Sequence, residues 1–210
     1  MSPLKSTTTP QGKIFSLGRI DFNAPVILGL TFICLVILIL NNITGGVVNR
    51  MLAVYYVSWA NPTQYLRLFT HVLAHANLAH YTGNFLLILA IGPLVEEKYG
   101  SRNLFIMFLI TAVATGFFET FLFPNTALIG ASGLAFMLIL LASFTNIRDG
   151  HLPLTVLLVG VLYIGTEILN GLLMDDNISQ LAHIVGGLCG AGFGIFLNSR
   201  KKRNKNSTIV

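Results

Sequence analysis

The chain has little charge and few cysteines, and each shortage narrows the class of protein. Only 10% of its 210 residues are charged, while 54% are hydrophobic. A soluble domain usually carries about 25% charged residues, so the sequence predicts a single-domain integral membrane protein. Cys34 and Cys189 each lie in an apolar run, as small buried side chains do, and indicate neither a disulfide framework nor a metal cluster.

The polar beginning of the chain lacks the signal-peptide pattern of a short apolar core followed by a small-residue cleavage site. The first apolar run is therefore expected to stay in the membrane. We divide the chain into an N-terminal segment over 1–25, a membrane domain over 26–198 and a basic tail over 199–210.

Crossing the hydrocarbon core takes about 20 mainly apolar residues. The expected fold class is an all-α membrane protein with six transmembrane helices, near residues 26–43, 79–97, 103–122, 130–147, 152–174 and 180–198. The segment between the first two, Thr44 to Leu78, contains Tyr55, Tyr56, Trp59 and Tyr65. Aromatic residues favour the membrane–water interface, so we expect this loop to lie in the outer leaflet.

Basic residues indicate the orientation. Six spans place both termini on one side, together with 11 of the 13 lysines and arginines, and leave Arg50 and Arg67 opposite. The positive-inside rule makes the first side cytoplasmic. The tail Arg200–Lys205 is interpreted as a topology anchor that touches anionic lipid, with no nucleic-acid partner.

Polar residues inside apolar spans often mark function. His80 and Asn84 open the second predicted span, Ser132 the fourth and His183 the sixth. All three spans run inward, and counting residues places these side chains roughly 18–24 Å above the inner boundary. Three distant segments thus supply polar groups to one layer.

The chemistry of this layer is that of a nucleophile and its base. A serine hydroxyl needs an adjacent base, usually histidine, so Ser132 and His183 are the candidate catalytic pair. Gly130 and Gly133 permit close approach to a substrate, and N–H groups of a first helical turn can face an oxyanion.

His80 and Asn84 share one helix face and are the candidate side-chain donors to that oxyanion, although interhelical hydrogen bonding alone would also explain them. No aspartate adjoins the motifs, which favours a Ser–His dyad, yet Glu167 inside the fifth span leaves a triad open. His71 and His75 have metal-ligand spacing without the His-Glu-x-x-His arrangement. We predict neither metal nor cofactor.

Small residues recur every four positions at Ala182, Gly186, Gly190 and Gly194. Such a stripe allows close helix packing in membranes. Packing of the sixth span on the fourth would bring His183 to Ser132. A packing face without catalysis is the alternative.

Taken together, these motifs resemble the rhomboid family of intramembrane serine proteases. The resemblance covers roughly residues 62–195 and rests on His80-x-x-x-Asn84, Gly-Ala-Ser-Gly at 130–133 and Ala182-His183 with its glycine repeat. Arg67 with His71 and His75 resembles the family's loop before its second helix. Glu96-Glu-Lys-Tyr-Gly100-Ser101 resembles its turn into the third.

The resemblance implies a minimal six-helix fold with a water-filled cavity open to the outside, in which Ser132 attacks, His183 acts as base, and His80, Asn84 and the Ser132 N–H stabilise the oxyanion. Arg67 would organise an outer-leaflet loop. Two positions depart from the commoner pattern: Leu66 stands where tryptophan is frequent, and Phe136 where tyrosine is frequent.

The expected function is cleavage of transmembrane protein substrates near the outer membrane face, in what we expect to be a bacterial inner membrane. One alternative is a small proton-coupled transporter using His80, His183 and Glu167 as a relay, although no internal repeat supports it. Another is a non-catalytic protein that binds membrane clients.

Overall fold

The computed structural model describes residues 23–144, 154, 158, 162 and 180–207. This part of the chain is helical, and its β-structure is limited to one antiparallel bridge between Val54 and Leu128. The all-α class predicted from composition is confirmed.

Four described helices are long and apolar enough to cross a membrane: α1 (Pro25–Ile43), α4 (Leu78–Tyr99), α5 (Ser101–Leu122) and the Gln180–Leu197 part of α8 (Gln180–Ser207). Three of the corresponding predicted spans agree within two residues at both ends, and α8 continues beyond the predicted end. The predicted span at 130–147 corresponds to the shorter apolar helix α6 (Ser132–Phe144). Of the predicted span at 152–174, the structure describes only residues 154, 158 and 162.

The aromatic loop after α1 contains two short helices and one 3₁₀ turn: α2 (Val47–Leu52), α3 (Pro62–Thr70) and η1 (His71–Leu73). Thr70 Oγ1 donates to the Leu52 carbonyl at 3.0 Å, and two hydrogen bonds of 2.9 and 3.1 Å join Val54 to Leu128. The loop is therefore fastened both to itself and to the segment that precedes α6.

Local sequence explains where these helices begin. Pro62 opens α3 after Asn61, whose side-chain oxygen accepts from the Thr63 N–H. Asn77 caps α4 by accepting from the His80 N–H at 2.8 Å. Asparagine is a favoured N-cap because its oxygen satisfies an N–H group that lacks an intrahelical partner.

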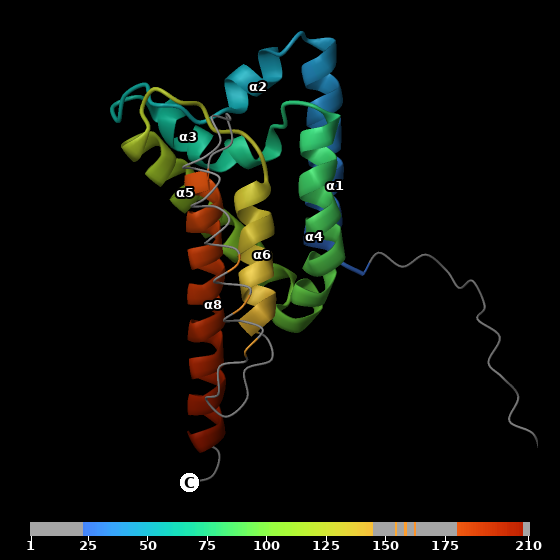
Figure 1. Cartoon of the computed structure of the whole chain (residues 1–210), viewed down its shortest axis with the longest axis vertical. Helices are drawn as coiled ribbons and strands as arrows, with labels where there is room; N and C mark the ends of the chain where they lie inside the picture. The colour runs from blue at the N-terminus through green and yellow to red at the C-terminus, as the bar shows by residue number, and fades with distance from the viewer. Residues whose placement is uncertain (1–22, 145–153, 155–157, 159–161, 163–179, 208–210) are drawn as a thin grey trace, which may run out of the picture.

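Helix α6 forms the centre of the bundle and contacts α4, α5 and α8. Its Leu134, Met137, Leu138 and Leu141 are almost completely buried. In Figure 1, α4, α6 and α8 all begin at the end of the molecule where α2 and α3 lie. This common direction matches the parallel arrangement predicted for the three spans that carry the polar residues, so their polar first turns are brought to one end.

Candidate active site

Ser132 is the first residue of α6 and follows a glycine turn. Gly130 has φ +119°, a conformation that glycine adopts without steric cost, and its N–H donates to the His71 carbonyl at 3.0 Å. The Ala131 carbonyl accepts from the N–H groups of both Leu134 and Ala135 at 3.0 Å. Ser132 is half-buried, and the first two N–H groups of α6, those of Ser132 and Gly133, precede these first bonds of the helix. The turn thus places a half-buried serine beside backbone donors.

His80 and Asn84, one turn apart on α4, lie against this glycine turn. A Cβ placed on Gly130 would come within 2.6 Å of His80 Nε2 and 3.5 Å of Asn84 Nδ2. The missing side chain at Gly130 is therefore what allows both polar groups to approach the residues before Ser132.

A hydrogen bond assigns the proton of the His80 ring. The Ala76 N–H donates to His80 Nδ1 at 3.4 Å, so a neutral His80 carries its proton on Nε2. Since Nε2 is the atom facing Gly130, His80 presents a donor toward the glycine turn. This is the polarity that an oxyanion site requires.

Helix α8 packs on α6 through backbone contact. A Cβ added at Gly186 would overlap the Gly133 carbonyl, and one at Gly190 would overlap the Met137 carbonyl. Gly194 meets the Phe144 side chain in the same way. The small-residue stripe thus forms the close helix contact that its spacing predicts.

His183 lies in the first turn of α8, where this contact begins. Its ring is half-buried and packs on Phe136 of α6, with centroids 4.5 Å apart and planes inclined at 42°. Phe136 lies one turn after Ser132, and a Cβ on the intervening Gly133 would be 3.2 Å from the Ala182 carbonyl. The first turns of α6 and α8 therefore meet, with Ser132 on one helix and His183 on the other.

Two buried histidines support the turn from the loop side. His71 Nε2 lies 3.0 Å from the Ala112 carbonyl, to which its N–H can donate, and burial lowers its pKa to about 4. His75 Nε2 accepts from the Ala131 N–H at 3.4 Å. Burial, followed by the neighbouring His80, lowers the pKa of His75 to about 4. Both rings are neutral at pH 7.

Two predicted residues, Arg67 and Glu96, lie outside the cluster formed by the Gly130–Ser132 turn, His75, His80, Asn84 and His183. Both carboxylate oxygens of the buried Glu96 accept from the N–H groups of Val26 and Ile27, at 3.0 and 3.1 Å, so Glu96 caps α1 from the last turns of α4. The guanidinium of Arg67 lies 4.2 Å from the Tyr55 ring centroid. These two residues hold the scaffold around the cluster.

The two departures from the commoner family pattern also have positions. Leu66 is 63% exposed on α3, so its side chain is not part of the buried contacts that fasten the loop. Phe136 keeps the ring contact with His183. Glu167, the carboxylate considered for a triad, lies outside the described residues.

Sequence reasoning missed Asn49 and the contact made by His75. Asn49 Nδ2 donates to the His75 carbonyl at 2.8 Å. No local pattern indicated that an asparagine in α2 reaches the segment before α4. The hydrogen bond from the Ala131 N–H to the His75 ring likewise depends on long-range packing and has no local sequence signal.

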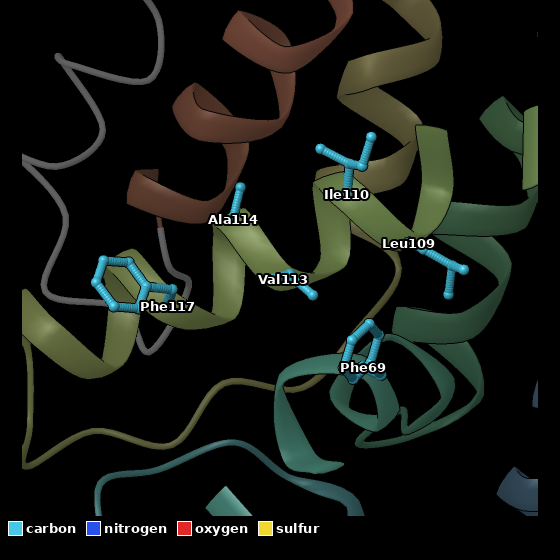
Figure 2. A pocket seen from close by; sticks show the side chains of 6 residues that line it. All are labelled: Phe69, Leu109, Ile110, Val113, Ala114 and Phe117. Atoms are coloured by element: carbon cyan, nitrogen blue, oxygen red, sulfur yellow. The ribbon is translucent and has the colours of Figure 1, made fainter. Parts of the chain in front are cut away.

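An apolar groove lies between α3 and α5, with a volume of about 390 Å³. Figure 2 shows Phe69 of α3 pointing toward Leu109 and Val113 of α5. The lining also includes Ile110, Ala114 and Phe117. Because none of these side chains is polar, the groove supplies no catalytic group.

Comparison with known proteins finds a matching family model and several similar proteins. A family model described as the rhomboid domain matches residues 62–200. The chain is 29% identical over 174 residues to "Rhomboid protease GlpG" of Serratia proteamaculans, an alignment covering 79% of this chain and 60% of the relative. It is 29% identical over 168 residues to "Rhomboid protease GluP" of Bacillus subtilis, covering 77% and 33%.

A third relative is "Rhomboid-like protein 11, chloroplastic" of Arabidopsis thaliana, which is 28% identical over 127 residues, covering 60% of this chain and 41% of the relative. The chain spans about 60% or less of the length of these curated relatives. The family match itself includes every residue of the cluster described above.

Proposed function

The chain belongs to the rhomboid family, and from this premise we propose that it is a serine endopeptidase cleaving transmembrane segments of membrane proteins near the outer membrane face. Supporting observations are the relatives named rhomboid proteases and the four apolar helices able to span a bilayer. The observation that carries the proposal is the meeting of the Gly130–Ser132 turn with His80, Asn84 and the His183-bearing end of α8.

In the proposed mechanism, Ser132 Oγ attacks the carbonyl carbon of the scissile peptide while His183 accepts the hydroxyl proton. The negative charge on the carbonyl oxygen is stabilised by the Nε2–H of His80, the amide of Asn84 and the N–H of Ser132. His183 then protonates the leaving amine, and a water molecule, deprotonated by His183, hydrolyses the acyl-enzyme.

A dyad is proposed because the sequence places no aspartate beside these motifs. Phe136 would hold the His183 ring by packing against it, because phenylalanine has no hydroxyl with which to orient the imidazole. Glu167 would line the wet cavity rather than act as the third member of a triad.

The proposed setting is a bacterial inner membrane with six spans and both termini in the cytoplasm. Segment Thr44–Leu78 would rest in the outer leaflet, with Arg67 organising it through its contact with Tyr55. A helical substrate hides its carbonyls in hydrogen bonds, so we expect cleavage at segments with small or helix-destabilising residues. Equally fast cleavage of polyleucine helices would contradict this substrate rule.

The first test is labelling of the purified protein by a fluorophosphonate probe in detergent. We expect labelling of the wild type, and its loss in Ser132→Ala and in His183→Ala, because the probe reacts with a serine activated by a base. A folded wild-type sample that remains unlabelled, or a His183→Ala variant that labels normally, would overturn the proposed dyad.

A further inference from the structure

His75 contacts the Gly130–Ser132 turn, here called the catalytic turn, but it belongs neither to the proposed dyad nor to the proposed oxyanion donors. Its side chain is fully buried, and Nε2 accepts from the Ala131 N–H at 3.4 Å. The same ring packs edge-on against His80, with centroids 5.2 Å apart and planes inclined at 64°. One side chain therefore contacts both the residue before the nucleophile and a proposed oxyanion donor.

The backbone of His75 is held from outside the catalytic cluster. Asn49 Nδ2 donates to the His75 carbonyl at 2.8 Å, and the Asn49 N–H donates to Asn41 Oδ1 at 2.8 Å. Asn41 lies in the last turn of α1, and Asn49 lies in α2. A row of hydrogen bonds thus runs from α1 through α2 and His75 to Ala131.

The catalytic turn needs such a restraint because it is built on glycine. Gly130 at φ +119° has the backbone freedom of a residue without Cβ. Its N–H is fixed by the His71 carbonyl, and the next N–H, that of Ala131, is fixed by His75. With both peptide groups held, Ser132 enters α6 in one orientation.

We propose that His75 and Asn49 are positioning residues of this protease, through which the loop helix α2 sets the orientation of the Gly130–Ser132 turn and of the His80 ring. This inference rests on the proposed function. It assigns to α2 a part in catalysis although no residue of α2 contacts a substrate group or a member of the dyad in this mechanism.

The test compares first-order fluorophosphonate labelling rates at saturating probe with the labelled fraction of the sample. We expect His75→Leu, which removes the acceptor, to lower the maximal rate about tenfold or more, because small misplacements of reacting groups cost large factors in rate. His75→Gln keeps an oxygen that can accept from Ala131, so it should retain the rate within about threefold.

Asn49→Ala should lower the maximal rate about threefold to tenfold, and adding it to His75→Leu should cause no further loss, because residues acting through one contact are not additive. The matched control is Asn103→Ala, which also removes an asparagine-to-carbonyl hydrogen bond, to Tyr99 at 2.7 Å, at the far end of α4. The control should label at the wild-type rate.

A purely structural role would reduce the labelled fraction and the thermal stability while leaving the rate constant of the labelled fraction unchanged. That result in both His75→Leu and Asn49→Ala would overturn the inference, as would equal rates for the leucine and glutamine variants. A wild type that does not label at all would instead overturn the proposed protease function first.

Discussion

Helices α1 and α8 lie on opposite sides of α6 (Figure 1), and they are attached to the bundle in different ways. Helix α8 meets α6 backbone to backbone at Gly186 and Gly190. Helix α1 is held by side chains: Glu96 caps its first turn, and Tyr81 donates to the Thr31 carbonyl at 3.1 Å. Side chains can readjust, whereas a glycine contact between backbones cannot.

This difference follows the role that the proposed mechanism gives to each helix. In the proposed mechanism, His183 on α8 has to reach the Ser132 hydroxyl on α6 within hydrogen-bond distance to act as general base. Helix α1 supplies no proposed catalytic group. Of these two helices, the one that carries the proposed base meets α6 through backbone contact, and the one held by side chains carries no proposed catalytic group.

The largest effect should come from Gly186→Ala. Its Cβ would overlap the Gly133 carbonyl next to Ser132 and force the first turns of α6 and α8 apart. We expect the fluorophosphonate labelling rate to fall about 100-fold or more. Gly192→Ala on the same helix is the control, since its Cβ would meet nothing within 4 Å. Similar rates in the two variants would show that the α6–α8 contact does not set catalytic geometry.

Glu96→Ala should lower the free energy of unfolding without changing the fluorophosphonate labelling rate. It removes two charge-assisted hydrogen bonds to the start of α1, which we expect to lower the free energy of unfolding by about 3 kcal/mol. The folded fraction should label at the wild-type rate. Glu97→Ala, at an exposed neighbouring position, provides the control in denaturant titrations. A slowed labelling rate in Glu96→Ala would remove the distinction between α1 and α8.

Lowering the pH should reduce the stability contributed by the loop between α1 and α4, which contains His71 and His75. The pKa values of His71 and His75, about 4 in the folded protein against 6.5 ordinarily, mean that the unfolded chain binds more protons between these limits. Stability is therefore highest above pH 6.5 and falls as the pH drops toward 4, by at most about 1.4 kcal/mol per pH unit for each histidine.

Thermal unfolding measured across this range, with His71→Gln beside the wild type, checks the expectation. Glutamine can still donate to the Ala112 carbonyl but does not titrate, so the melting temperature of the variant should depend less steeply on pH. Identical slopes would show that His71 is not a source of the acid sensitivity.

The smallest effect should come from Gly92→Ala, the counterpart of Gly186→Ala on the α1 side. The new Cβ would overlap Cδ1 of the Ile27 side chain, with Cγ1 at 2.8 Å. Because the Cδ1 end of the buried Ile27 side chain can shift more readily than a backbone carbonyl, we expect a stability loss of about 1–2 kcal/mol and an unchanged labelling rate. A loss as large as that of Gly186→Ala would contradict the contrast between side-chain and backbone contact.

Local sequence was sufficient to predict features that depend on periodicity. The apolar runs predicted α1, α4 and α5, and the four-residue stripe predicted the packing face of α8. The stripe was informative because a glycine repeat in a membrane helix has few other uses. Counting residues along each span to its cytoplasmic end also predicted that the polar turns would lie at one end of the bundle. That prediction depends only on the rise per residue of an α-helix.

Features that depend on the identity of a distant partner could not be predicted. Glu96 belongs to a turn that the sequence predicts, but nothing near it in the sequence indicates that its partners are the Val26 and Ile27 N–H groups, 70 and 69 residues away. The bond between Asn49 and His75 has the same character. Such contacts arise only after the helices have packed, and they leave no periodic signal.

The backbone contact between α6 and α8 also has a consequence for biosynthesis. Ser132 leaves the ribosome before His183, and the proposed base reaches the proposed nucleophile only when the last described helix docks against α6. Domains assemble as the chain is made, so a partly inserted chain would hold its serine without a base. The order of the elements would therefore keep the unfinished protein inactive in a membrane full of other proteins' helices.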